Sequence, residues 1–210
     1  MRIQYRHPKL YQFLVQVFYP KALWEKLRAE VGENNTVFDV GAGFGYVARF
    51  LHPSNQYYGI DRNEIFVEYG RKNGRNLELK DIFDKSAYRE SDIFLVIDVV
   101  HHFSIEKLKI LFDLIFAHTK KKVIVVEPTF LSKYNHYGIG GNFVGWIFRI
   151  LDGDGFNKIG SWLREEEYQK LFQSRFSSEY DGNFEMNHQK VGGHHFVVFA
   201  RNEKAAGHRW

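Results

Sequence analysis

The fold of this chain is decided by residues 37–46, VFDVGAGFGY, where an apolar run leads into three glycines at alternate positions. The apolar run predicts a β-strand at 36–40, and the residues after the glycines predict a helix over 46–51. Glycine lets the backbone turn sharply and lets a ligand lie against bare main chain at a helix start. The segment therefore predicts a ligand-binding strand, turn and helix within an α/β sheet.

The position of the last glycine separates two classes of ligand. A nicotinamide or flavin fingerprint needs its third glycine at position 46, where this chain has Tyr46. Asp39 lies two residues before the first glycine, at the carboxyl end of the predicted strand. A carboxylate there would repel phosphates but can face an ammonium or sulfonium group. The turn therefore favours a cationic ligand over a pyrophosphate.

Strand-like and helical segments alternate along the rest of the chain, which is typical of βαβ units and a parallel sheet. Further strands are predicted at 57–60, 77–80, 93–99, 123–126, 176–187 and 195–201. Helices are predicted as a pair over 8–31 and singly at 65–71, 105–118 and 162–172. The predicted fold is a three-layer Rossmann-like α/β sandwich. Its seven-stranded sheet is mostly parallel with an antiparallel last strand, helices cover both faces, and an N-terminal helical cap precedes it.

Carboxylates come at the ends of the next three predicted strands. Asp61 follows the second strand about 20 residues beyond the glycine turn, a spacing that suits hydrogen bonds to two ribose hydroxyls. Asp81 offers an acceptor for an exocyclic adenine amine, and Ile82 beside it offers an apolar neighbour for the ring. Asp98 opens the run DVVHHF at 98–103, at the end of the fourth strand. Taken singly, Asp39, Asp61 or Asp81 could instead cap a helix or a turn.

With these motifs, the chain resembles the class I S-adenosylmethionine-dependent methyltransferases, specifically over 35–127 and more loosely over 162–201. The resemblance implies S-adenosyl-L-methionine as cofactor and methyl transfer as the reaction. It implies that Asp39 and the glycine backbone hold the methionine part, Asp61 the ribose and Asp81 with Ile82 the adenine, and that Asp98 lies near the methyl. The predicted cofactor-binding residues are Asp39, Gly41, Ala42, Gly43, Gly45, Asp61, Arg62, Asp81, Ile82 and Asp98.

Histidines are the candidates for acid–base chemistry. His101 and His102 can supply a general base if the acceptor must lose a proton, or they can simply shape the pocket. Glu127, at the end of the fifth strand, is open between pocket lining and structure. No metal site is predicted from these histidines and the pair at 194–195, because no nearby carboxylate completes an obvious ligand set.

Length and composition limit the organisation and compartment of the protein. Its 210 residues, 44% of them hydrophobic, suit a single domain. The expected parts are a cap at 1–30, a cofactor-binding core at 35–127, a substrate lid or insertion at 128–161, and a final helix and strand pair at 162–201. The absence of cysteine favours a cytoplasmic location. No signal peptide and no run of about 20 apolar residues is present, so no membrane span is expected.

The acceptor is the least determined part of the prediction. The formal charge of +4 gathers at the two ends of the chain, so nucleic acid is not expected as a partner. The lid carries aromatic residues that suit a small-molecule or lipid-like acceptor with an O, N or C nucleophile. These are Tyr134, Tyr137, Phe143, Trp146 and Phe148. An RNA or protein methyltransferase and a non-catalytic S-adenosylmethionine-binding module remain as alternatives, and the oligomeric state is not predicted.

Overall fold

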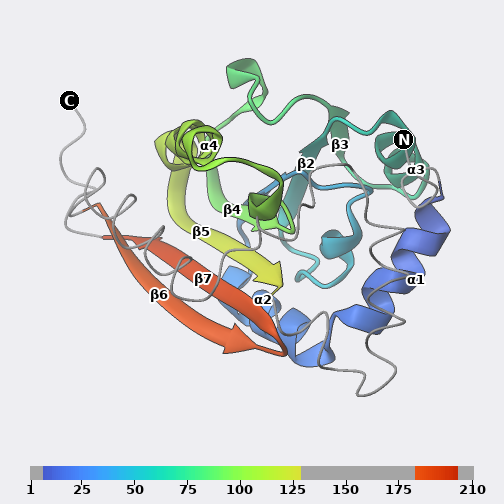
Figure 1. Cartoon of the computed structure of the whole chain (residues 1–210), viewed down its shortest axis with the longest axis horizontal. Coiled ribbons are helices and arrows are strands. Elements are labelled where there is room, and N and C mark those ends of the chain that lie inside the picture. The colour runs from blue at the N-terminus through green and yellow to red at the C-terminus, as the bar shows by residue number, and fades with distance from the viewer. Residues whose placement is uncertain (1–6, 129–182, 203–210) are drawn as a thin grey trace.

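The computed structural model describes residues 7–128 and 183–202 (Figure 1). The predicted lid beyond residue 128, the helix predicted at 162–172 and the C-terminal tail beyond residue 202 lie outside these ranges. The helices are α1 (Pro8–Phe18), α2 (Lys21–Val31), α3 (Glu64–Lys72) and α4 (Ile105–His118), with short 3-10 helices η2 (Tyr46–Arg49), η3 (Lys85–Ala87) and η4 (Val100–His102). The strands are β1 (Thr36–Val40), β2 (Gln56–Asp61), β3 (Leu77–Leu79), β4 (Ser91–Ile97), β5 (Thr119–Pro128), β6 (Phe184–Val191) and β7 (His194–Arg201).

The strands form one seven-stranded sheet in the order β3-β2-β1-β4-β5-β7-β6. The neighbours from β3 to β5 pair in parallel, and β7 pairs antiparallel with both β5 and β6. The predicted sheet, mostly parallel with an antiparallel last strand, is therefore confirmed. The order reverses between β1 and β4, and such a switch point opens a crevice at the carboxyl ends of the strands.

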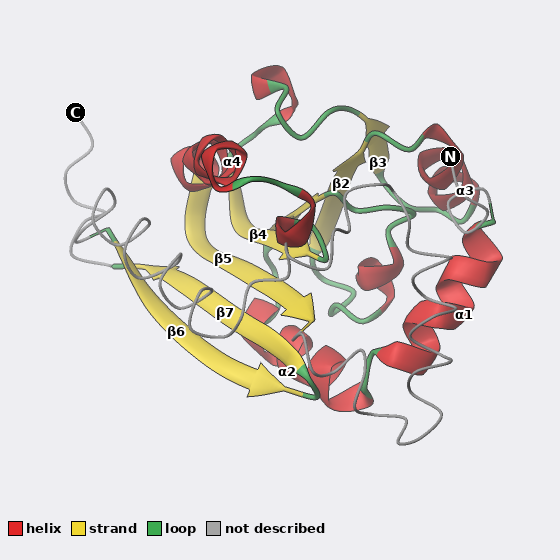
Figure 2. Cartoon of the chain, in the orientation of Figure 1, coloured by secondary structure: helices red, strands yellow, loops and turns green. Residues whose placement is uncertain are grey.

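Helices pack on both faces of the sheet, which gives the predicted three layers (Figure 2). Along β1, Val37 faces one core and Phe38 faces the other, because successive side chains of a strand point to opposite sides. α4 fills the Phe38 side, with Phe112 and Leu111 fully buried. α2 and α3 fill the side of Val37. Each face thus removes a continuous apolar surface from water, which is the main stabilising contribution to the fold.

The N-terminal cap is built from α1 and α2, as predicted, and aromatic contacts fix it to the core. Trp24 of α2 stacks on Phe50 with ring centroids 4.3 Å apart. Tyr11 of α1 lies 5.3 Å from Phe66 of α3, again between ring centroids. Tyr19, between the two helices, packs against His194 of β7 at 4.7 Å. The cap is therefore held both by the β1–α3 half of the chain and by the C-terminal hairpin.

Several predicted boundaries were wrong. β5 runs from Thr119 to Pro128, whereas a strand was predicted only at 123–126. The helix predicted at 46–51 is a single 3-10 turn that ends at Arg49. Pro53 disfavours helical backbone at His52 and so keeps a helix from extending further along the chain. β4 ends at Ile97 rather than at 99, since Asp98 has a positive φ of 58° and leaves the strand.

The end of β6 was also predicted wrongly, because the strand runs to Val191, beyond the predicted end at 187. Its alternating polar residues belong to an edge strand and resemble a loop in sequence. The turn at Gly192 and Gly193, with φ of 54° and 78°, joins it to β7. Among the described residues, no helix has the length and apolarity to span a membrane.

Candidate functional site

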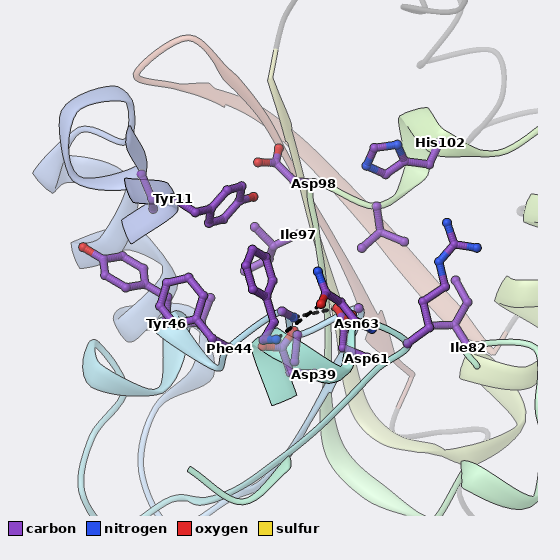
Figure 3. Close-up of a pocket in the computed structure, with 18 of the residues that line it drawn as sticks. Tyr11, Asp39, Phe44, Tyr46, Asp61, Asn63, Ile82, Ile97, Asp98 and His102 are labelled. Carbon is purple, nitrogen blue, oxygen red and sulfur yellow. Dashed lines mark hydrogen bonds between the residues drawn. The ribbon is translucent and has the colours of Figure 1, made fainter. Parts of the chain in front are cut away.

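A cavity of about 890 Å³ opens at the carboxyl ends of β1, β2 and β4, beneath α1. Its volume lies within the range of about 300–1,000 Å³ typical of small-molecule sites. The residues predicted to bind or act there that line it are Asp39, Gly41, Ala42, Gly43, Asp61, Arg62, Asp81, Ile82, Asp98 and His102. Figure 3 shows Asp39 and Asp61 on one side of the pocket, and Asp98 and His102 across from them. Gly45 and His101 are not among its lining residues.

The glycine turn adopts backbone conformations that other residues rarely reach. Gly41 has a φ of 72°, and a Cβ placed there would lie 2.7 Å from Cγ2 of Val99. Gly43 has a φ of 56°. Gly41 therefore lets the loop after β1 lie close to the loop after β4, so that both loops border one cavity.

Asp39 is a buried carboxylate with one close hydroxyl partner. Its side chain is almost fully excluded from solvent, and the hydroxyl of Tyr57 donates to Oδ2 over 2.6 Å. Burial raises the pKa of Asp39 to about 7; the hydrogen bond from Tyr57 opposes the rise and the charge of Asp61 adds to it. A cation placed beside this carboxylate would stabilise its ionised form.

Sequence reasoning missed Tyr57. Gly59 is the register partner of Asp39, and a Cβ at Gly59 would lie 3.1 Å from the Tyr57 hydroxyl. The absence of a side chain at Gly59 thus leaves room for this hydroxyl, as it does for Ala42 and Leu77, whose atoms a Cβ would approach to 2.6 and 2.8 Å. A glycine opposite an acid in the next parallel strand is the sequence signal that could have suggested it, but only once the register is known.

Asp61 is held by the backbone. Its Oδ2 accepts from the N–H of Gly43 at 2.8 Å, and its Oδ1 accepts from the N–H of Asn63 at 2.7 Å. Burial raises the pKa of Asp61, and these two N–H groups partly oppose the rise. An ionised carboxylate has about four acceptor positions. Asp61 is thus oriented firmly by the backbone, and its carboxylate retains some acceptor capacity for a ligand.

The loop after β3 forms the apolar end of the site. Asp81 is exposed, with Oδ1 accepting from the N–H of Phe83 at 2.9 Å, and Ile82 is buried. Phe83 packs edge-on against Phe103 at 5.2 Å between ring centroids. A carboxylate beside apolar side chains suits a flat ring with an exocyclic amine.

The two candidate bases occupy different environments. His102 lines the pocket, whereas the side chain of His101 is 6% exposed and its Nδ1 lies 2.7 Å from Oε2 of Glu127. Glu127 also accepts from the backbone N–H of Val99 and Val100 at 2.8 and 2.7 Å. Burial by itself would raise the pKa of Glu127, but the charge and hydrogen bond of His101 outweigh it, so that the pKa is lowered. Glu127 therefore has a structural role in holding the 98–102 turn.

Aromatic side chains form one wall of the pocket, on the side where the N-terminal cap lies. They come from α1, α2, the turn between them, the glycine loop and α3: Tyr11, Tyr19, Trp24, Phe44, Tyr46 and Phe66. The aromatic stripe of the N-terminal helices thus contributes both to the core and to the pocket. The aromatic residues predicted to form a lid, from Tyr134 to Phe148, lie outside the described residues.

Comparison with solved structures places this geometry in a known fold. Over 86% of this chain, the pyocyanin biosynthetic protein PhzM superposes with a TM-score of 0.62 at 19% identity, and the match covers 54% of PhzM. The chain has the class I methyltransferase fold. The plantazolicin methyltransferase BpumL, in complex with SAH, gives a TM-score of 0.63 at 12% identity, covering 95% of this chain and 87% of BpumL. Magnesium protoporphyrin IX methyltransferase from Synechocystis PCC 6803, with bound SAM, superposes with a TM-score of 0.57 at 12% identity. The match covers 96% of this chain and 86% of that methyltransferase.

The present chain spans about half the length of PhzM. No protein-family model and no curated protein sequence matches it.

Proposed function

We propose that this chain is an S-adenosylmethionine-dependent methyltransferase acting on a small-molecule or lipid-like acceptor. The observation that carries the proposal is the convergence of Asp39, Asp61 and Asp81 on one pocket at the switch point of a class I methyltransferase fold. Solved structures of similar fold contain SAM or SAH. These three carboxylates, together with Asp98 in the same cavity, favour a ligand with several donor groups and a positive charge.

Three groups of pocket residues would each bind a different part of the cofactor. Asp39 and the glycine turn at 41–43 would take the methionyl ammonium. Asp61, oriented by backbone N–H groups and lining the pocket, would accept from the ribose hydroxyls. Asp81 and Ile82 would take the adenine amine and ring. Arg62, which also lines the pocket, carries the cationic charge beside Asp61.

The chain's contribution to the reaction is alignment and exclusion of water. When bound, S-adenosylmethionine supplies an electrophilic methyl group on a sulfonium. In-line transfer needs the acceptor atom held opposite the sulfur, a geometry that fixed walls provide. Asp98 and His102 lie across the pocket from Asp39 and Asp61 (Figure 3), and His102 is the imidazole positioned to accept a proton from the acceptor. His101 acts through the turn it fixes.

The aromatic wall supports a small or lipid-like acceptor. Tyr11 and Tyr19 of the cap line the same pocket as the cofactor residues. Aromatic rings bind apolar or planar ligands over a large area. A pocket of about 890 Å³ has a size suited to compact ligands rather than to an open macromolecular surface.

Calorimetric titration with S-adenosylmethionine and S-adenosylhomocysteine tests the cofactor. We expect micromolar dissociation constants, weakened by about 1.5–3 kcal/mol in Asp61→Ala because a charge-assisted contact is lost. Glu68→Ala, on the exposed part of α3, is the control and should bind as the wild type does. Failure of the folded protein to bind either ligand would overturn the proposal.

A panel of acceptors, scored by release of S-adenosylhomocysteine, tests the substrate class. Turnover of small apolar or aromatic acceptors supports the proposal. Labelling of RNA or protein with no small acceptor turned over would replace it with a macromolecular methyltransferase. Tight cofactor binding with no turnover in either panel would replace it with a non-catalytic binding module.

A further inference from the structure

Three side chains of types that can ligate a metal ion lie together at the ends of β4 and β5. One donor atom each from Asp98, His101 and Glu127 lies within 4.8 Å of the other two. The sequence-based expectation of no metal site rested on the lack of a carboxylate near the histidines. In the structure Glu127 supplies that carboxylate, 2.7 Å from His101. These three residues are the β4–β5 triad.

The fold brings the triad together through strand pairing. β4 and β5 are parallel neighbours, and the N–H of Asp98 donates to the carbonyl of Val126 at 3.0 Å, which sets Asp98 beside the end of β5. The positive φ of Asp98 then turns the chain back across Glu127. Val99 and Val100 donate their N–H groups to Oε1 of Glu127, and the following 3-10 turn brings His101 to Oε2.

The roles of the two Glu127 oxygens suit a metal ligand. Oε1 is fixed by two backbone donors, the kind of supporting contact that orients carboxylates in metal sites. Oε2 faces the imidazole of His101. Oxygen and nitrogen ligands about 2.1 Å from one ion are about 3.0–3.4 Å apart. A cation between His101 and Glu127 therefore needs their atoms to separate by less than about 1 Å from the present 2.7 Å.

Charge and access favour a cation at this place. Two carboxylates approach each other here, one of them 1% exposed, and a divalent ion would compensate both. Asp98 lines the pocket, so that an ion held by the triad has a path to solvent and to whatever the pocket contains. One imidazole and two carboxylates, with coordination positions left open, form a donor set used by Mn²⁺, Zn²⁺ and Fe²⁺.

We propose that Asp98, His101 and Glu127 form a binding site for a divalent first-row metal ion at the rim of the pocket. The existence of the site does not depend on the proposed function, but the role of the ion does. If the protein transfers methyl groups, the ion would bind an oxygen of the acceptor through an open coordination position and favour loss of the proton from that oxygen.

The test is a titration of chelator-treated, full-length protein with Mn²⁺, followed by electron paramagnetic resonance of the free ion and repeated calorimetrically with Zn²⁺. We expect one ion per chain and at least a tenfold loss of affinity in Asp98→Asn, His101→Asn and Glu127→Gln. Two carboxylate variants outside the triad, Asp61→Asn in the pocket and Glu68→Gln on the surface, should retain wild-type metal affinity.

Asp98→Asn is the decisive variant, because its amide keeps the shape of the side chain and removes only the charge. Circular dichroism establishes that each variant is folded. No binding of Mn²⁺ or Zn²⁺ to the folded wild type at millimolar concentration overturns the site, as does binding that all three triad variants retain. Metal binding without any S-adenosylhomocysteine binding would support the metal site and refute the methyltransferase proposal. S-adenosylhomocysteine binding without metal binding would refute the metal site and leave the methyltransferase proposal supported.

Discussion

The pH dependence of cofactor affinity tests the electrostatics of the pocket most directly. Asp39 is buried, its pKa is raised to about 7, and it is proposed to face the methionyl ammonium. Only the ionised carboxylate attracts that cation. Below pH 7 most of the ligand-free protein therefore carries a protonated Asp39, which must lose its proton when the cofactor binds.

The size of the effect follows from the fraction of protein in the competent state. With a pKa of about 7, the ionised fraction is about 0.9 at pH 8 and about 0.1 at pH 6, and the apparent dissociation constant is divided by that fraction. The constant for S-adenosylhomocysteine should thus rise about tenfold between pH 8 and pH 6, equivalent to about 1.4 kcal/mol. Near pH 7, binding should release about half a proton per site.

Calorimetry in buffers of different ionisation enthalpy measures both the affinity and the released proton. Asp39→Asn is the matched control, because its amide oxygen can still accept the hydrogen bond from Tyr57 while the titrating group is gone. We expect the variant to bind more weakly at pH 8 and to lose the change in affinity between pH 6 and pH 8. A wild-type affinity that is flat over this range, or an equal slope in the variant, would refute the reasoning.

The raised pKa of Asp39 also predicts how the stability of the ligand-free protein depends on pH. The folded state keeps a proton on Asp39 that the unfolded state, in which the carboxyl has its ordinary pKa of 3.8, releases. This contribution to the free energy of unfolding is therefore largest below pH 3.8 and falls as pH rises to about 7. Denaturation with urea at several pH values should show the fall in wild type and not in Asp39→Asn. Two further substitutions extend these tests. Tyr57→Phe removes the hydrogen bond that holds down the pKa of Asp39, so the midpoint of the pH-dependent binding should move to higher pH in the same calorimetric titration; an unchanged midpoint would contradict this. Gly41→Ala should lower the free energy of unfolding by about 1–2 kcal/mol, because alanine is strained in the left-handed backbone at this position. The contact between the added Cβ and Val99 should lower it further. Gly74→Ala has a similar φ, and its added Cβ would meet nothing within 4 Å, so equal urea midpoints for the two variants would contradict the contact.

The residues predicted to bind the cofactor line one pocket because they follow strands. Asp39, Asp61 and Asp81 each lie at or just after the carboxyl end of an apolar run, and parallel strands bring those ends to one edge of the sheet. Their clustering thus follows from periodicity and order along the chain. Arg62 and Ile82 were found for the same reason, as immediate neighbours of those acids.

The division of roles between the histidines could not be predicted. His101 and His102 are adjacent in sequence, and only the 3-10 turn after β4 sends one to Glu127 and leaves the other at the pocket. Tyr57 was missed for a similar reason, because its contact with Asp39 depends on the register between β1 and β2 and on the space at Gly59.

The sequence by itself determined the sheet, the glycine turn and the row of carboxylates, since these depend on local periodicity and on chain order. The tertiary structure decided which side chains meet across strands: Tyr57 with Asp39, and Glu127 with His101 and the 98–102 turn. Such contacts join residues about 20 or more positions apart. Register and backbone twist fix their geometry, and neither is expressed in the pattern of a single segment.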